Sequence, residues 1–291
     1  MPSLSLLSQS IADGLLLGCV YAIVAVGLTL VFGVLRIVNF AHGDFLMVAL
    51  YISFVLAERL GWDPYVAIPL TLLGGLGAAW VAYRVCLEPL LNTEESRQVV
   101  STLGISLIIQ NAILLLFSGD MHSVPSRFGD SMLVVGNLFL RWPVVVAALV
   151  SIVLCGCLYW LLHATDVGRQ IRASAENRDA AQLCGLRITR LYRIAFCLGV
   201  GTLGLVGPLI APFYVISPTI GGNFTLMSFV VVVLGGIGSF AGALLGGLII
   251  GVVQAVAGLY TEGSMALIFT YLIFVVVLLF RPAGIFGVQR A

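Results

Sequence analysis

The chain has 291 residues, of which 60% are hydrophobic and only 9% are charged. Soluble globular domains carry about 25% charged residues, so this composition excludes a water-soluble globular protein and predicts an integral membrane protein. A net charge of +1 gives no reason to expect a nucleic-acid partner. All fourteen basic residues are arginine. The missing lysine excludes a GxxxxGK[ST] loop, because that loop needs an ammonium group to reach the phosphates.

Apolar segments follow one another along the whole chain, near 9–32, 45–60, 65–87, 99–117, 143–163, 194–211, 224–238, 241–259 and 265–280. A spanning helix needs about 20 mostly apolar residues. The pattern therefore predicts an all-α polytopic membrane protein with nine transmembrane helices, or eight if one short segment is re-entrant. No acid lies at the centre of a segment, which argues against a proton-coupled carrier. Sodium sites built from backbone carbonyls remain open.

The cysteines give no sign of a metal site. Cys155 and Cys157 stand two residues apart, and on a helix such side chains point in different directions. Thiols in apolar segments behave as small hydrophobic groups. We therefore expect buried free cysteines, no metal ligands, no catalytic residues and no cofactor bound by this chain.

The distribution of arginine predicts the orientation. Six of the fourteen arginines lie in the segment 164–193, and the C-terminal tail adds Arg281 and Arg290. Short loops rich in arginine stay in the cytoplasm, so we expect 164–193 and the C-terminus to be cytoplasmic. Counting crossings backwards places 118–142 outside, 88–98 inside and the start of the chain outside.

Two short stretches resemble each other. One runs from Gly43-Asp44-Phe45 to Met47, and the other from Gly222-Asn223-Phe224 to Met227. Each opens a short apolar segment after about a dozen irregular residues, with Asp44 and Asn223 as candidate N-caps. The preceding helices would run in opposite directions, so the pattern predicts an inverted repeat with interrupted helices, as transporters often have. Coincidence is the alternative, because glycine and phenylalanine are common in membrane helices.

Polar residues near these breaks are the candidates for lining a pathway: Asn39, His42, Asp44, Gln110, Asn111 and Asn223. Hydrogen bonds between packed helices explain most such residues. His42 is expected to form a hydrogen bond, with a role as proton donor as the alternative.

Glycine spacing predicts close helix packing. Gly14 and Gly18, Gly242 and Gly246, and Gly247 and Gly251 form small-xxx-small faces. These faces need a close neighbour, either within the chain or from another chain. The run Gly235-Gly236-Ile237-Gly238 predicts a tight turn between two segments.

The segment 164–193 is patterned rather than merely polar. A helix from Asp166 to Leu183 would place four charged residues on one stripe: Arg169, Arg172, Glu176 and Asp179. Within this stripe, Arg172 and Glu176 would form an i,i+4 pair. The opposite face would carry Ile171, Ala173, Ala180 and Ala181, and Gly185 would end the helix. A docking element is the prediction, and a solvated loop is the alternative.

These residues carry a family resemblance. Asp179-Ala180-Ala181-x3-Gly185 resembles the EAA-x3-Gly pattern with which ABC importer permeases dock their ATPase subunits, with aspartate in place of glutamate. Further stretches resemble branched-chain amino-acid permeases. In the first half of the chain, Gly27-Leu28-Thr29-Leu30-Val31-Phe32-Gly33-Val34 is followed by Ile37-Val38-Asn39-Phe40-Ala41-His42-Gly43-Asp44. The second half adds Gly168–Ala173, Leu234–Ser239 and Arg281-Pro282-Ala283-Gly284-Ile285-Phe286-Gly287. The chain is similar to the smaller partner permease of the high-affinity importers of that family.

The resemblance implies that residues 1–291 form a single transmembrane permease domain in a bacterial inner membrane. It implies a second homologous permease, two ABC ATPase subunits that use ATP and Mg, and a periplasmic binding protein that delivers leucine, isoleucine or valine. Arg169, Arg172, Glu176, Asp179, Ala180, Ala181 and Gly185 would couple the chain to the ATPases, with the three small residues as the contact face. A permease for urea or short-chain amides, or a passive channel for a small solute, remain as alternatives.

Overall fold

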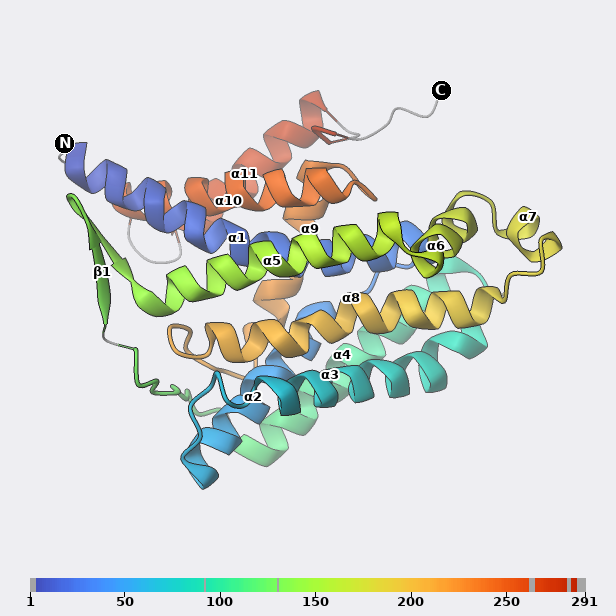
Figure 1. Ribbon diagram of the computed structural model, residues 1–291, viewed down its shortest axis with the longest axis horizontal. Helices are drawn as coiled ribbons and strands as arrows, with labels where there is room; N and C mark the ends of the chain where they lie inside the picture. Colours follow the sequence, from blue (N-terminus) through green and yellow to red (C-terminus); the bar gives the residue numbers. More distant parts are fainter. Residues whose placement is uncertain (1–3, 92, 130, 262–264, 282–283, 287–291) are drawn as a thin grey trace.

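The computed structural model describes residues 4–91, 93–129, 131–261, 265–281 and 284–286. The helices are α1 Leu4–Leu35, α2 His42–Leu60, α3 Ile68–Ala82, α4 Glu95–Phe117, α5 Trp142–Ala164, α6 Asp166–Glu176, α7 Arg178–Leu183, α8 Ile188–Ile210, α9 Ile220–Gly235, α10 Phe240–Tyr260 and α11 Met265–Phe280. Within the described residues, the strands β1 Met132–Val135 and β2 Leu138–Arg141 form one antiparallel hairpin. The predicted all-α membrane fold is confirmed (Figure 1).

Six helices in the described part of the chain are long and apolar enough to cross a membrane: α1, α4, α5, α8, α10, and α3 with its extension to Leu90. That extension adds a π-helical turn, Tyr83–Leu87, and a 3-10 turn, Glu88–Leu90. Helices α9 and α11 have 16 residues each. Helix α2 has 19 residues and begins inside the bundle. The prediction of interrupted short helices is therefore confirmed for α2 and α9.

Helices α1 and α8 form the centre of the bundle. The stretch of α1 from Val20 to Val31 is buried, as is most of α8 after Ala195. Helix α4 and helix α11 are peripheral and expose most of their leucine and valine side chains. Exposed apolar residues on these helices fit a lipid environment, since a membrane solvates such side chains as well as a protein interior does.

Glycines bring α1 and α10 into backbone contact. A Cβ on Gly14 would lie 2.7 Å from Cα of Val252, and one on Gly251 would lie 2.5 Å from Cα of Gly18. The predicted glycine faces are thus confirmed as packing surfaces. The glycine faces of α1 and α10 are covered by other helices of the same chain, so they supply no argument for a second permease.

The two halves are related in the way the repeat predicts. Helices α1 and α8 run in opposite directions, and each leads through an irregular segment, 36–41 or 211–219, into a short helix that starts inside the bundle (Figure 1). The contacts between the halves are reciprocal. A Cβ on Gly27 would overlap the carbonyl oxygen of Gly199, and a Cβ on Gly199 would lie 2.5 Å from that of Gly27. A Cβ on Gly43 of α2 would overlap the carbonyl oxygen of Gly221 in α9, and a Cβ on Gly221 would overlap Asp44 of α2.

The loops gather at two opposite ends. Tyr83 donates to the carbonyl oxygen of Thr189, and Arg178 donates to that of Leu91, so the 88–98 loop lies at the same end as α6 and α7. At the other end, Gln9 of α1 exchanges hydrogen bonds with the backbone of Phe139 in β2. The predicted grouping of loops is confirmed. Arg290 and the rest of 287–291 lie outside the described residues.

Two helix starts differ from the prediction. Helix α2 begins at His42 and helix α9 at Ile220, so Asp44 and Asn223 stand inside the helices, and neither is an N-cap. Neither helix has a side-chain cap: Ala41 and Thr219 occupy the cap positions without a capping hydrogen bond. The N-cap prediction was therefore wrong at both helices. At α2 another element supports the helix start, since the amide of Gly43 donates to the hydroxyl of Thr225 in α9.

Candidate functional site

The irregular segment before α2 is held by a side chain of α4. The hydroxyl of Thr102 donates to the carbonyl oxygen of Val38 at 3.0 Å and accepts from the amide of Phe40 at 3.3 Å. The Asn39 side chain accepts from the amide of Ala41 at 3.2 Å, which closes a local turn. A segment that leaves α1 therefore turns back into the bundle instead of continuing out of it.

The first turn of α2 meets α9. The hydroxyl of Thr225 accepts from the amide of Gly43 at 2.8 Å and donates to the carbonyl oxygen of Phe40 at 3.3 Å. One of the free amides that every helix start presents is thus satisfied by a residue of the other repeat. This contact explains why α2 needs no cap of its own.

Asp44 is buried among these elements. Its side chain is 0% exposed, and its Oδ1 accepts from Nε2 of Gln110 at 3.0 Å. The same Nε2 lies 3.1 Å from the hydroxyl of Ser106, so α4 presents a short polar row to α2. The other carboxyl oxygen, Oδ2, is buried without a hydrogen-bond partner among the described residues. Asp44 in the first turn also suits the helix dipole.

His42 fixes the depth of this cluster. Its Nε2 donates to the carbonyl oxygen of Val24 at 2.9 Å. Val24 stands eleven residues before the end of α1, about 16 Å along the helix, which is about half the thickness of a bilayer core. Asp44 stands two residues further along α2, about 3 Å from this level. Asp44 thus stands at the edge of its apolar segment, as expected from the sequence, but α2 begins inside the bundle, so this edge lies at membrane depth.

Four of the six candidate pathway residues lie in this interior region. Asn39, His42 and Asp44 are each at least 99% buried, and Gln110 reaches Asp44 from α4. Nδ2 of Asn39 and Nδ1 of His42 are further buried polar atoms without a partner among the described residues. Unpaired buried polar atoms cost free energy and call for an explanation. The cluster has the unfilled hydrogen-bonding capacity of a site that rearranges or receives a polar group.

The two other candidates lie elsewhere. Asn111 is exposed on α4, where its Nδ2 donates to the carbonyl oxygen of Leu107 at 2.7 Å. Asn223 is exposed near the start of α9. The sequence prediction missed Thr102, although a threonine in an apolar segment signals a hydrogen bond to the backbone. Ser106 and Thr225, which also belong to the cluster, were not among the predicted candidates.

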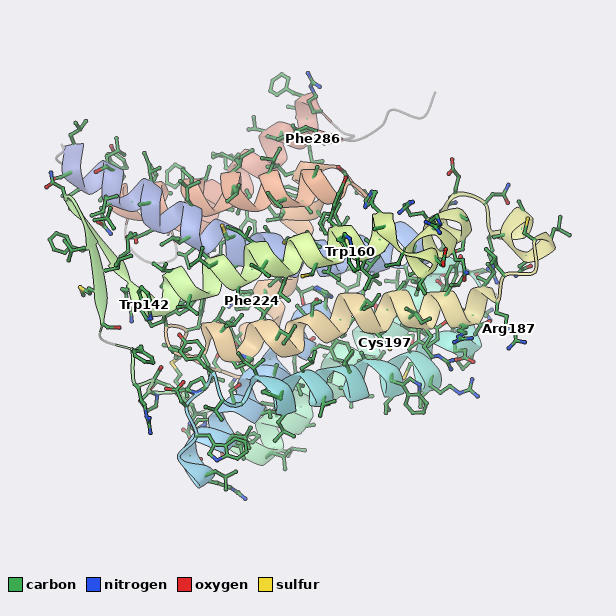
Figure 2. All side chains as sticks on the ribbon, in the orientation of Figure 1. Trp142, Trp160, Arg187, Cys197, Phe224 and Phe286 are labelled. Carbon is green, nitrogen blue, oxygen red and sulfur yellow. The ribbon has the colours of Figure 1, made fainter. Side chains whose placement is uncertain are left out.

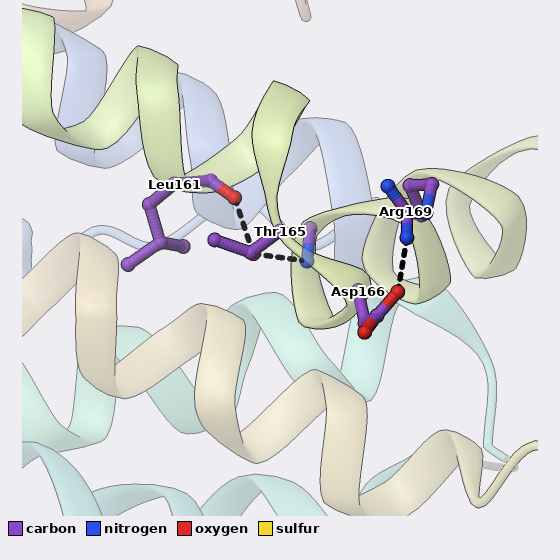
Figure 3. Close-up of polar contacts among 5 residues, drawn as sticks. Leu161, Thr165, Asp166 and Arg169 are labelled. Carbon is purple, nitrogen blue, oxygen red and sulfur yellow. Dashed lines mark hydrogen bonds and ion pairs between the residues drawn. The ribbon is translucent and has the colours of Figure 1, made fainter.

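The segment 164–193 forms two helices. Helix α6 begins after Thr165, whose hydroxyl accepts from the amide of Gly168 at 3.1 Å and donates to Leu161 at 2.6 Å (Figure 3). It ends at Glu176. The predicted continuous helix from Asp166 to Leu183 was wrong, because the Asn177 side chain accepts from the amide of Ala180 at 3.0 Å and starts α7 anew.

The predicted charged stripe is also divided. Arg169 pairs with Asp166 (Figure 3). Arg172 donates to the carbonyl oxygen of Leu162 at the end of α5, and it forms no ion pair with Glu176. The i,i+4 pair was therefore wrong. Glu176 is exposed at the end of α6.

The small residues expected to form one contact face point in different directions. Ala180 is exposed, whereas Ala181 is 5% exposed and packs on its own chain. Gly185 is exposed with φ of 81°, a left-handed conformation that ends α7. Asp179 is exposed as well, and Leu183 is the most exposed large hydrophobic residue at this end, at 90%. Helix α7 projects from the end of the molecule near Arg187 (Figures 1 and 2).

Two of the stretches that carry the family resemblance contact each other. Gly236 and Gly238 take positive φ values of 102° and 82°, which confirms the predicted turn between α9 and α10. The amide of Ile285 donates to Leu234 at 2.8 Å, and that of Phe286 donates to Gly235 at 3.1 Å. The segment after α11 is thereby attached to this turn. Pro282, Ala283 and Gly287 lie outside the described residues.

Comparison with known proteins gives a consistent result. The family model described as branched-chain amino acid transport system / permease component matches residues 10–278. The high-affinity branched-chain amino acid transport system permease protein LivH of Salmonella typhimurium is 30% identical over 298 residues, covering 96% of this chain and 95% of that protein. The corresponding permease BraD of Pseudomonas aeruginosa is 29% identical, covering 99% of this chain and 98% of BraD. The probable LivH permease of Methanocaldococcus jannaschii is 28% identical, covering 92% and 88%.

No solved structure matches the chain. The family match spans both the interior cluster and the α6–α7 segment, so it applies to the whole membrane fold rather than to one motif. The chain belongs to the family of permease components of branched-chain amino acid transport systems.

Proposed function

We propose that the chain is the transmembrane permease subunit of an ABC importer for leucine, isoleucine and valine. The observation that carries the coupling to separate ATPase subunits is α7, which projects beyond the bundle with Leu183 90% exposed at its end. An apolar side chain so fully exposed outside the membrane-spanning helices is suited to a pocket on a partner. ATP and Mg would be used in that partner, because this chain carries no loop for binding nucleotide phosphates.

The orientation follows from charge. Most described arginines lie at the α6–α7 end of the bundle, in its loops or at the helix ends next to these loops. The exceptions among the described residues are Arg59, Arg127 and Arg141. Short loops rich in arginine remain in the cytoplasm. In a bacterial inner membrane, the segment 164–193 and the C-terminus would therefore face the cytoplasm, and the β1–β2 hairpin would face the periplasm. A periplasmic substrate-binding protein would dock at the hairpin end.

A second homologous permease would complete the pathway. The glycine faces of α1 and α10 do not support this partner, since both are used within the chain. The support comes from the family, and the partner would contact other helix faces. Purification of the complete transporter in mild detergent should give a particle much larger than 30.9 kDa. A transport-competent monomer of this chain would refute the proposal.

The contacts around Arg36 offer a route for coupling. Arg36 ends α1 with φ of 57°, unusual for a residue other than glycine. Its guanidinium donates to the carbonyl oxygen of Ala175 in α6 at 3.2 Å. The next residues form the segment that Thr102 holds before α2. ATP-driven movement of α6 and α7 would thus reach the interior polar cluster through a few covalently linked residues.

The test uses the complete transporter in proteoliposomes, with leucine-stimulated ATP hydrolysis and leucine uptake as readouts. Leu183→Asp should weaken retention of the ATPases about tenfold to a hundredfold, because burying a leucine is worth about 1.5–3 kcal/mol. Gln182→Asp places the same charge on the neighbouring exposed residue and should be milder. Leucine uptake that continues unchanged without the ATPases would contradict the proposal and favour a passive channel.

A further inference from the structure

A cavity lies at the start of α9, on the periplasmic side of the proposed orientation. Its volume is about 520 Å³, within the range of about 300–1,000 Å³ typical of small-molecule sites. Helices α1, α9, α10 and α11 and the segment 211–219 form its walls. Met121, 77% exposed, and Val215, 55% exposed, stand at its rim. The Phe224 side chain that faces it comes from the middle of the bundle (Figure 2).

Aromatic and aliphatic side chains make up most of the lining. The rings of Tyr214 and Phe224 lie 5.2 Å apart, and Tyr21 meets Phe224 edge-on at 6.4 Å. Ile220 and Met227 of α9 add aliphatic surface, and both are nearly buried. Such walls suit an apolar side chain, which gains free energy in proportion to the area removed from water.

Polar groups are present in small number. The hydroxyls of Tyr21 and Tyr214 share a hydrogen bond of 3.1 Å. The Gln254 side chain lies beside the Tyr21 hydroxyl, and its Oε1 is buried without a hydrogen-bond partner among the described residues. None of the lining residues is aspartate, glutamate, arginine or lysine. The cavity can therefore hold a ligand of zero net charge with polar ends, and it gives no counter-ion to an acidic or basic side chain.

The α9 start that borders the cavity is open, unlike its repeat-related counterpart. At the α2 start, the amide of Gly43 donates to the hydroxyl of Thr225, and the first helical residues, His42 to Asp44, are buried. At the α9 start, Thr219 provides no side-chain cap, and Asn223 is exposed. Free amides at a helix start attract a carboxylate. The Ile220 amide already donates to the carbonyl oxygen of Ser217 at 3.2 Å. Of the two related helix starts, the one at α9 presents an exposed first-turn residue, Asn223, to the cavity.

We propose that this cavity binds a zwitterionic amino acid with a branched aliphatic side chain. The side chain would lie between Phe224 and Met227, the carboxylate at the first turn of α9, and the ammonium group at Oε1 of Gln254. This assignment rests on the proposed function and adds the place where the permease selects its substrate. Selection by the permease is distinct from selection by the binding protein that delivers the amino acid.

The first experiment narrows the cavity. Met227→Trp fills space in the lining, whereas Leu226→Trp places the same ring on the 53% exposed neighbour that does not line the cavity. Uptake of radiolabelled leucine and valine is measured with the complete transporter at concentrations well below saturation, where the ratio of rates reports selection. Since one methylene in an apolar pocket changes selection by about 10–200-fold, Met227→Trp should lower the leucine-to-valine uptake ratio at least about tenfold. The ratio should stay unchanged in Leu226→Trp.

The second experiment does not depend on a large side chain being tolerated. Asn223→Cys is treated with a maleimide that cannot cross the membrane, and leucine uptake is then measured, with Leu226→Cys and the unaltered chain as controls. Modification should block uptake only in Asn223→Cys, and added leucine should slow that modification. Suppose that the unaltered chain takes up leucine. If the leucine-to-valine uptake ratio is then unchanged in Met227→Trp, or if leucine does not slow the modification of Asn223→Cys, the cavity proposal alone is overturned. An unaltered chain that takes up no leucine overturns the proposed function itself.

Discussion

The contact between Gly43 and α9 allows a quantitative prediction. A Cβ on Gly43 would overlap the carbonyl oxygen of Gly221 and lie 2.6 Å from the amide nitrogen of Thr225. These are backbone atoms, which cannot rotate away, so Gly43→Ala must push α2 and α9 apart. Overpacking costs about 1–3 kcal/mol. Loss of the bond from the Gly43 amide to Thr225 adds about 0.6–1.7 kcal/mol, the range measured between membrane helices.

The two costs together predict a loss of about 1.6–4.7 kcal/mol for Gly43→Ala. At roughly 2–4 °C per kcal/mol for a chain of similar size, the Tm should fall by about 3–19 °C. The assay is thermal unfolding of the purified complex in detergent, followed by size-exclusion chromatography of the soluble fraction. Gly77→Ala is the matched control, since a Cβ there meets nothing within 4 Å and should stabilise α3 by about 0.5–1 kcal/mol. A Gly43→Ala protein as stable as the unaltered chain would refute the reasoning.

Three further predictions concern the interior cluster and the α6–α7 segment. In a double-mutant cycle, Asp44→Ala and Gln110→Ala should show a coupling energy of about 0.6–1.7 kcal/mol in thermal unfolding; strict additivity would contradict the interhelical hydrogen bond. His42→Gln should leave the pH profile of transport unchanged, because the ring is fully buried and donates to Val24; a titration near 6.5 that disappears in the variant would instead identify a proton donor. Ala181→Trp should displace α7 and abolish ATPase co-purification, since overpacking of this buried position costs about 1–3 kcal/mol, whereas Arg169→Ala should be mild because exposed ion pairs are worth about 0–1 kcal/mol. The reverse order would show that charge rather than packing holds the segment.

The sequence was sufficient to predict the membrane fold, the interrupted helices and the inverted repeat. These features depend on composition and on the similarity of the Gly43 and Gly222 stretches, both of which are local properties. The cap positions were misplaced by three residues at Asp44 and by four at Asn223, because prediction from side-chain type assumed that each helix supplies its own cap. At α2 the support comes from Thr225, almost two hundred residues away in the chain.

The candidate site was predicted only in part for the same reason. The cluster of Asn39, His42, Asp44 and Gln110 was named from residue type, but its link to Thr102 depends on how α4 packs. The break between α6 and α7 had a sequence signal, since Asn177 is a favoured cap residue. The burial of Ala181 had no such sequence signal, because burial of an alanine on a short helix depends on which residues the helix packs against.

The backbone crossing at Gly27 and Gly199 has a mechanical consequence. Two helices without side chains at their crossing cannot slide past each other without leaving close contact, but they can tilt about it. Gly199 stands at the middle of α8, eleven residues from either end, which is about 16 Å. A tilt of about 10° would move each end by about 3 Å in opposite directions. The crossing would then act as a fulcrum, with α8 as a lever of equal arms whose inner end begins just after α7.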